Sequence, residues 1–245
     1  GRGVSTVAAS GWTNTGTASM SKSFEYGASI ALSSVVTPSR KTGYTGTSYS
    51  KTSGSGTLSG SNFTVSSGVA TITVAASGIS APSISLSPLT STGVYNYTDT
   101  TLTATNSTSY ASGITVYYAF GNSTSSSGTY SYNADTTTNT YSIGKTSHRG
   151  SKYYKVQAYA TDGTLTSSKT TSDAATVTLN NVKITFDATS NGGTISGSSA
   201  LYTSYNNASM YTTVSGTTGG TVPSASKTGY TFNGWYTAKT GGNQI

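Results

Sequence analysis

The chain has 245 residues, no cysteine, one histidine and only 8% charged residues, whereas an ordinary soluble domain carries about 25%. Thirteen basic and six acidic residues give a formal charge of +7, but most basic residues are scattered singly, unlike the dense basic stripe of a nucleic-acid-binding protein. No apolar run reaches the roughly 18 residues of a membrane span. One histidine without cysteine cannot build the usual zinc, haem or iron–sulfur sites. We therefore expect no cofactor, metal, nucleic-acid partner or membrane span.

Alternation of apolar and hydroxyl-bearing residues is the main pattern along the chain, and it indicates β-strands rather than helices or disorder. In chain order, we expect strands at residues 69–75, 83–87, 101–105, 114–120, 154–160, 175–179 and 182–186. The residues expected to point inward are Ile72, Val74, Ile84, Leu86, Ile114, Val116, Tyr118, Phe120, Tyr154, Val156, Ala158 and Ala160. Short strands at this spacing, separated by Gly, Asn, Asp and Ser clusters, are typical of small sandwiches or mixed sheets.

Two turn sequences interrupt the last part of this pattern. Asn180-Asn181 separates the strands at 175–179 and 182–186, and we expect a joint there. Asn191-Gly192 is a common hairpin dipeptide. We therefore expect residues 194–196 to fold back on the strand at 182–186 as a hairpin.

One pentapeptide, Lys-Thr-Gly-Tyr-Thr, occurs twice, at residues 41–45 and 227–231. A proline precedes each copy, Pro38 in the first and Pro223 in the second. Repeats of this kind are typical of modular arrays rather than of enzymes. Because the two copies flank a long stretch without the motif, we expect three units, at residues 1–78, 79–181 and 182–245.

The third unit carries an ordered set of motifs. Ile-Thr-Phe-Asp at 184–187 is followed by Asn-Gly-Gly at 191–193, by Pro223, and by Gly-Tyr-Thr-Phe-Asn-Gly-Trp-Tyr at 229–236. This order resembles the bacterial surface repeat known as the Listeria–Bacteroides repeat, or internalin B-repeat. The resemblance implies a β-grasp-like module of an extracellular protein, to which the family normally adds one more strand after the position of Ile245. Its structural motif would consist of Gly229, Tyr230, Phe232, Gly234, Trp235 and Tyr236.

The first unit resembles the same family more weakly. The residues that it shares with the family pattern are Tyr26, Gly27, Pro38, Gly43 and Tyr44. Residues 4–12 resemble the terminal strand of such a repeat, so we expect consecutive copies to complete each other's sheets by strand exchange. The side chains of that exchanged strand would be Val4, Val7, Ala9 and Trp12.

The middle unit is similar to bacterial immunoglobulin-like or fibronectin-like modules, through its strand and turn at residues 153–163. Its length also fits such a sandwich, which has about 100 residues. The chain as a whole is thus expected to be all-β to β-rich. Its tandem small modules would be a central immunoglobulin-like β-sandwich flanked by β-grasp-like repeat units.

The second copy of the motif also has a physical interpretation without the family. Gly229 and Gly234 permit a positive φ or a close backbone approach. The four aromatic residues between 230 and 236 are expected to fill the core, because so small a unit has little other apolar surface to bury. A sugar-stacking platform is the alternative role of these rings.

No pattern of catalytic residues is present in the sequence. His148 is the only base that titrates near neutral pH, and it lies in a polar, turn-like stretch, so we expect an exposed loop histidine. The six carboxylates occur singly in different turns or strands, which supports neither a glycosidase pair nor a calcium loop. The chain is therefore not expected to be an enzyme.

The function that these features favour is an extracellular structural or adhesive protein, a stalk or filament segment at a microbial cell surface or in a secreted assembly. Its expected partners are copies of itself or neighbouring modules, with surface glycans or a host protein as further candidates. The alternative is a carbohydrate-binding module accessory to a secreted enzyme. The rings that could form its platform are Tyr95, Tyr97, Tyr130, Tyr132, Tyr202, Tyr205 and Tyr211. The candidate N-glycosylation sites are Asn62, Asn96, Asn106, Asn122 and Asn207.

Overall fold

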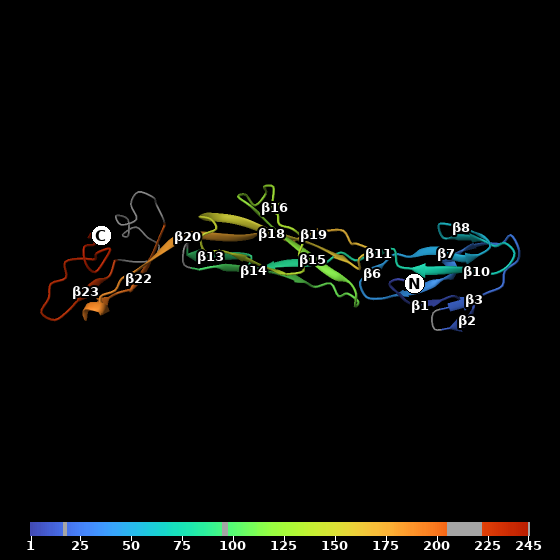
Figure 1. The fold of residues 1–245 in the computed structure, drawn as a ribbon, viewed down its shortest axis with the longest axis horizontal. Coiled ribbons are helices and arrows are strands. Elements are labelled where there is room, and N and C mark those ends of the chain that lie inside the picture. The colour runs from blue at the N-terminus through green and yellow to red at the C-terminus, as the bar shows by residue number, and fades with distance from the viewer. Residues whose placement is uncertain (17–18, 95–97, 205–221, 245) are drawn as a thin grey trace.

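The computed structural model describes residues 1–16, 19–94, 98–204 and 222–244. The expected all-β fold class is confirmed, because these ranges contain only two short helical segments, α1 (Leu32–Val35) and the 3-10 turn η1 (Thr189–Asn191). The strands form groups that follow one another along the long axis of the molecule (Figure 1). The amino terminus lies beside β6 and β11, close to the junction between the first two groups (Figure 1).

The first group consists of short antiparallel strands. Its strands are β1 (Val4–Ala8), β2 (Thr13–Gly16), β3 (Ser19–Ser21), β4 (Ser29–Ala31), β5 (Thr37–Arg40), β6 (Tyr44–Thr45), β7 (Ser48–Gly54), β8 (Thr57–Ser59), β9 (Asn62–Thr64), β10 (Ala70–Ala75) and β11 (Gly78–Ile79). They pair as β1-β5, β2-β3, β4-β9-β8, β7-β10 and β6-β11. Ile30, Leu32, Val36 and Phe63 form the buried centre. Ile72 and Val74 of β10 pack against this centre, as the alternation in the sequence predicted.

The second group is a β-sandwich. Its strands are β12 (Ile84–Ser87), β13 (Thr90–Val94), β14 (Thr100–Asn106), β15 (Thr115–Ser123), β16 (Ser131–Tyr132), β17 (Thr140–Ile143), β18 (Gly150–Thr161), β19 (Thr170–Thr171) and β20 (Ala175–Thr185). One sheet has the order β12-β14-β17 and the other has the order β13-β20-β18-β15-β16, with β19 also on β18. All pairs are antiparallel except β13 and β20, which run parallel.

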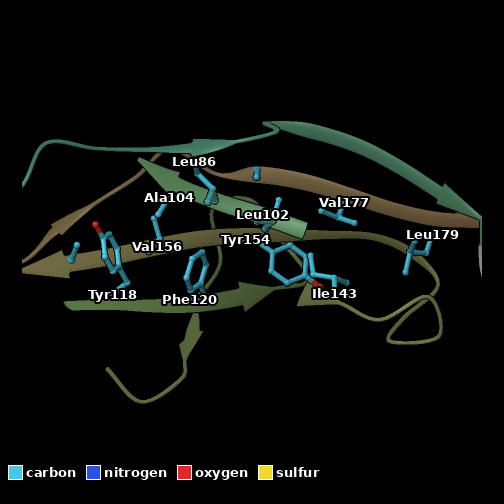
Figure 2. Packing of buried hydrophobic residues seen from close by; sticks show 12 residues of the cluster. Leu86, Leu102, Ala104, Tyr118, Phe120, Ile143, Tyr154, Val156, Val177 and Leu179 are labelled. Carbon is cyan, nitrogen blue, oxygen red and sulfur yellow. The ribbon is translucent and has the colours of Figure 1, made fainter. Parts of the chain in front are cut away.

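One hydrophobic core lies between the two sheets of the sandwich (Figure 2). Leu102, Val156, Val177 and Leu179 are fully buried, and Phe120 is 3% exposed. Period-two alternation brings these side chains to the same face of their strands. The threonines that alternate with Leu102, Val177 and Leu179 are more exposed. The expected inward positions in this sandwich are buried, except that Ile84, Ile114 and Val116 are only partly buried.

The predicted joint at Asn180-Asn181 is wrong as a turn, because β20 runs without interruption from Ala175 to Thr185. The first half of β20 pairs with β18, and residues 181–185 pair with β22 (Ala200–Ser204). Backbone hydrogen bonds on both halves keep the asparagine pair extended, although asparagine favours turns. The expected limit between residues 181 and 182 therefore lies inside a strand; the three-unit division itself stays a prediction.

The third group has less regular structure. It contains η1, β21 (Thr194–Ser196), β22 and β23 (Ser224–Ser226). The expected hairpin between residues 182–186 and 194–196 is wrong, because β21 pairs with β23. The turn at η1 and Gly192, which has a φ of +71°, carries the chain away from β20 before β21 begins. Phe186 is the buried member of the hydrophobic cluster in this group, and Ile184, Ile195 and Trp235 pack against it.

Candidate functional site

The first copy of the repeated pentapeptide forms a tight turn at the end of the first group. The backbone N–H of Tyr44 donates to the carbonyl oxygen of Lys41 at 3.1 Å. Gly43 has a φ of +85°, a conformation that favours glycine. After the turn, β6 pairs with β11, which leads directly into the sandwich. The turn thus lies at the junction of the first two groups.

Asp162 of the sandwich anchors this turn. Its Oδ2 accepts a hydrogen bond from the Tyr44 hydroxyl at 2.9 Å, and Arg2 Nε lies 3.7 Å from the same oxygen. Its Oδ1 accepts from the backbone N–H groups of Thr164 at 3.0 Å and Leu165 at 2.8 Å. The Asp162 side chain is only 8% exposed, whereas that of Arg2 is 43% exposed. A nearly buried carboxylate with these donors is a fixed structural contact.

The same contacts shift the titration of both side chains. Burial acts to raise the pKa of Asp162, but the hydrogen bonds from Leu165, Thr164 and Tyr44, together with the charge of Arg2, hold that pKa below its usual value. Burial raises the pKa of Tyr44, and the hydrogen bond to Asp162 raises it further. The pair therefore consists of an ionised aspartate and a neutral tyrosine at neutral pH.

Tyr110 completes the junction on the other side of the turn. A Cβ atom on Gly43 would lie 2.4 Å from Cδ1 of Tyr110, so only glycine fits beside this ring. The carbonyl oxygen of Thr42 accepts from the N–H of Ala111, and that of Gly43 accepts from the N–H of Ser80, both at 2.8 Å. We call this set of residues the first joint: Arg2, Thr42, Gly43, Tyr44, Ser80, Tyr110, Ala111 and Asp162.

The second copy of the pentapeptide lies beside an aromatic cleft in the third group. The cleft has a volume of about 980 Å³, and Phe186, Tyr230, Phe232, Trp235 and Tyr236 contribute to its lining. Tyr230 is 71%, Phe232 42% and Tyr236 49% exposed. The prediction that the four rings fill a core is therefore wrong for these three.

Trp235 is the ring of the motif that packs as expected. It is partly buried and lies 4.9 Å from Phe186 and 5.3 Å from Phe232 between ring centres. Its Nε1–H donates to the carbonyl oxygen of Pro223 at 2.7 Å, which ties the aromatic segment to the residue just before β23. Gly234 has a φ of +114°, which confirms the expected positive φ.

Polar groups surround the aromatic residues of the cleft. Lys227 Nζ donates to the carbonyl oxygen of Asn191 at 2.8 Å and lies 4.3 Å from the centre of the Tyr230 ring, where a cation–π contact is favourable. Asp187 accepts from the hydroxyl of Thr189 at 2.8 Å and from its N–H at 2.9 Å. Those bonds, with further ones from Ser190, lower the pKa of Asp187. The cleft therefore combines exposed rings with two lysines, Lys227 and Lys239, and one carboxylate.

His148 is not the exposed loop residue that the sequence predicts. It is half-buried, its Nε2 lies 3.1 Å from the carbonyl oxygen of Val177, and its Nδ1 lies 2.9 Å from Ser147 Oγ. Burial lowers its pKa, while the contact with Val177 acts in the opposite direction. A carbonyl can only accept, so Nε2 carries the proton. These contacts give His148 a packing role at the end of the sandwich.

The described ranges contain neither a candidate metal site nor a helix that could cross a membrane. No group of three His, Asp or Glu side chains in them is placed to hold a metal ion. Their longest helix is far too short and polar to span a bilayer. Every buried side-chain nitrogen or oxygen in these ranges has a hydrogen-bond partner.

The segment expected to exchange between copies is paired within its own chain. β1 lies antiparallel to β5, with Val7 opposite Pro38. Val4 is buried, and the Trp12 ring lies 5.5 Å from that of Phe24. Ala9 packs against the core of the first group. Strand exchange would have to replace or extend this pairing, and it stays a prediction.

The candidate glycosylation sites differ in accessibility. Asn62 is exposed on β9, whereas Asn122 is half-buried in β15. Asn106 is also half-buried, and its amide bonds the backbone of Thr108 in both directions at 3.0 Å. Asn96 and Asn207 lie outside the described residues. Asn62 is thus the most accessible of the three described sequons, and glycosylation stays a prediction.

The expected tyrosine platform is only partly described. Tyr132 covers Gly121, whose Cβ position is 2.6 Å from Cδ1 of the ring. Tyr130 donates to the carbonyl oxygen of Ser126 at 3.1 Å, and Lys155 Nζ lies 4.9 Å from its ring centre. These two rings pack on the sheet rather than standing free. Outside the described residues lie Tyr95, Tyr97, Tyr205, Tyr211 and the side chain of Tyr202.

Sequence reasoning missed the partners in the first joint. Asp162-Gly163 was recognisable as a turn, but nothing in the sequence places its carboxylate against Tyr44, 118 positions away. Arg2 and Tyr110 carried no signal at all. No protein-family model, curated protein or solved structure matches the chain. The resemblance of residues 182–245 to the Listeria–Bacteroides repeat therefore stays a prediction.

Proposed function

We propose that this chain is an extracellular structural and adhesive protein, a stalk or filament segment of a modular microbial surface protein. The observation that carries the proposal is the way successive groups are connected. A nearly buried aspartate holds the first group to the sandwich, and the continuous strand β20 links the sandwich to the third group. Such connections favour an extended body over independent beads on flexible linkers.

The composition supports the extracellular location. The chain has few charged residues and no cysteine. Its folding therefore does not depend on disulfide formation. Lysine and arginine, the residues at which trypsin-like proteases cut, are only 13 in 245. A hydroxyl-rich surface on short strands suits a module that displays binding surfaces instead of catalysing reactions. Its partners would be neighbouring modules or other copies of the chain.

The strand order of the sandwich supports an immunoglobulin-like assignment of residues 79–181. Such sandwiches pack two antiparallel sheets whose strands cross between the sheets by Greek-key connections. Here β12 and β14 lie in one sheet, while β13 and β15 lie in the other. This architecture occurs in proteins of many functions, so it does not identify a ligand. It is compatible with a structural role.

Small-angle X-ray scattering of the whole chain tests the stalk. We expect the unmodified chain to be one extended particle. In the variant Asp162→Ala the first group loses its anchor, so we expect a wider range of particle shapes. Asp99→Ala is the matched control, since Asp99 accepts one backbone N–H from Lys145 at the opposite end of the sandwich. A compact particle, or equal scattering from Asp162→Ala and Asp99→Ala, would contradict the stalk. Antibody labelling of intact source cells tests the location.

A carbohydrate-binding role is the second candidate, and the exposed rings of the cleft favour it. Tyr230, Phe232 and Tyr236 present aromatic faces beside Asn191 and a lysine, which is a common arrangement for sugar recognition. The variant Trp12→Phe leaves Trp235 as the only tryptophan, so its fluorescence reports on the cleft. A glycan array without a binder, together with unchanged fluorescence, would remove this candidate.

A further inference from the structure

The two copies of the pentapeptide adopt the same turn. In the second copy, the N–H of Tyr230 donates to the carbonyl oxygen of Lys227 at 3.1 Å, the same bond and distance as in the first copy. Gly229 has a φ of +81°, close to the +85° of Gly43. Each turn follows an antiparallel strand, β5 in the first group and β23 in the third. The repeated sequence therefore specifies a repeated shape.

The first turn is occupied on three sides. Its tyrosine hydroxyl donates to the carboxylate of Asp162, and the ring of Tyr110 lies against its glycine. The carbonyl oxygens of Thr42 and Gly43 accept backbone N–H groups that come from the sandwich side of the junction. This turn is thus one half of a contact whose other half is the end of a β-sandwich.

The second turn presents the same groups without such a partner. Nothing lies within 4 Å of the Cβ position of Gly229, where the first turn holds a tyrosine ring. Tyr230 is 71% exposed. Among the described residues, no group accepts from its hydroxyl or donates to the carbonyl oxygens of Thr228 and Gly229. The space and the hydrogen-bonding groups that a partner would use are therefore both open.

The charge beside the second turn matches an acidic partner. Lys227 Nζ lies 4.3 Å from the centre of the Tyr230 ring. In the first joint, Arg2 supplies the positive charge at Asp162. A carboxylate that accepted from the Tyr230 hydroxyl would have Lys227 within its electrostatic reach. The second turn therefore carries both the donor and the cation that an aspartate requires.

We propose that the turn at residues 227–230 is a docking site for the end of a β-sandwich module that presents an aspartate-led turn and a tyrosine ring, as Asp162 and Tyr110 do. In a second copy of this chain, the turn at residues 41–44 already covers Asp162 and Tyr110. A copy in which that turn is displaced would leave this end of its sandwich open, so it can be used to test binding by the turn at residues 227–230. The inference rests on the proposed structural role, for which it names the class of partner and the contact.

The variant Gly43→Val supplies this probe within the full chain. The new side chain collides with Tyr110 and strains a positive φ, so it removes the first turn from its site and exposes Asp162. The second turn of another copy can then occupy that site. We expect sedimentation equilibrium to show concentration-dependent association of Gly43→Val that the unmodified chain lacks.

A second substitution identifies the turn responsible. Gly229→Ala places a Cβ where the ring of the partner's tyrosine has to lie, and we expect it to weaken the association of Gly43→Val about tenfold. Gly241→Ala is the matched control, because Gly241 has a φ of +70° and equally open space. The double variant Gly43→Val with Gly241→Ala should associate like Gly43→Val alone.

Three results would overturn the docking site. They are no association of Gly43→Val, association that Gly229→Ala leaves unchanged, and equal losses with Gly229→Ala and Gly241→Ala. If Gly43→Val unfolds the first group and the copies stick nonspecifically, Gly229→Ala has no effect, which counts against the proposal. Gly43→Ala provides a milder opening of the same joint. The X-ray scattering of the unmodified chain does not depend on these outcomes. The proposed stalk function is therefore tested separately from the docking site.

Discussion

Replacing Tyr44 with phenylalanine removes one hydroxyl from the first joint and keeps its ring. That hydroxyl donates to Asp162 at 2.9 Å, and water replaces it poorly because the Asp162 side chain is 8% exposed. A hydrogen bond to a charged group contributes about 1.5–3 kcal/mol. The other carboxylate oxygen keeps two backbone N–H donors, so we expect a loss near the lower end, about 1.5–2 kcal/mol.

Hydrogen exchange measures this loss locally. The N–H groups of Ala111 and Ser80 donate to the carbonyl oxygens of the first turn, so they exchange when the joint opens. We expect Tyr44→Phe to lower their protection about tenfold or more. Arg2→Ala is the comparison, because its partner lies 3.7 Å away and its side chain is 43% exposed. Pairs of that kind contribute only about 0–1 kcal/mol.

The same contact has a pH dependence of known sign. Because the folded-state pKa of Asp162 is held below its unfolded value of about 3.9, its stabilisation is fully present above that pH. It is lost as the pH falls through the folded-state pKa, and Asp162→Asn should lack this loss. The reasoning is refuted if Arg2→Ala costs as much as Tyr44→Phe, or if Tyr44→Phe costs the same in an Asp162→Asn background.

Three further predictions concern the sandwich and the third group. Leu102→Ala empties a fully buried position and should destabilise the sandwich by about 2–5 kcal/mol in urea unfolding; a loss below 1 kcal/mol would contradict its place in the core. Because the pKa of His148 is lowered in the folded state, its neutral form stabilises the fold above a pH of about 6.5, and this contribution is lost as the pH falls. The stability of His148→Gln should lack that pH dependence between about pH 7 and 5. Trp235→Phe removes the bond to Pro223 and should cost about 1 kcal/mol in thermal unfolding, whereas an unchanged melting temperature would show that the bond contributes nothing.

Strand positions and their buried faces were predictable from the sequence. In β14 and in residues 154–160 of β18, side chains alternate between a buried set and a polar set, and a strand has to place those sets on opposite faces. Burial of the apolar set then determines which face packs against the other sheet. The positive φ of Gly43 and Gly229 also depends on neighbouring residues alone, because a turn that needs a positive φ selects glycine.

Pairing between distant strands was not predictable from the same pattern. Asn180-Asn181 has the composition of a turn, yet β18 and β22 hold it in a strand. Asn191-Gly192 has the composition of a hairpin, yet β21 finds its partner in β23, far along the chain. In both cases, hydrogen bonds to non-local strands outweigh the local preference, which spans only about 1 kcal/mol.

Exposure of the aromatic motif was also beyond the sequence. The spacing of Tyr230, Phe232 and Tyr236 is that of a packed aromatic strand, and their hydrophobicity favours burial. Burial requires a covering surface, and the described part of the third group supplies one mainly around Phe186 and Trp235. The amount of covering surface depends on how elements pack, which no single segment encodes.

The amino-acid sequence by itself determined that this protein is built from β-strands, which faces of those strands are apolar, and that one turn shape occurs twice. These properties arise from neighbouring residues, because side-chain alternation and glycine conformation act over a few positions. Only the tertiary structure decided that Tyr44 meets Asp162 while Tyr230 stays exposed. The two turns are the same in sequence and in shape, and they differ because the end of a sandwich packs against one of them and not against the other.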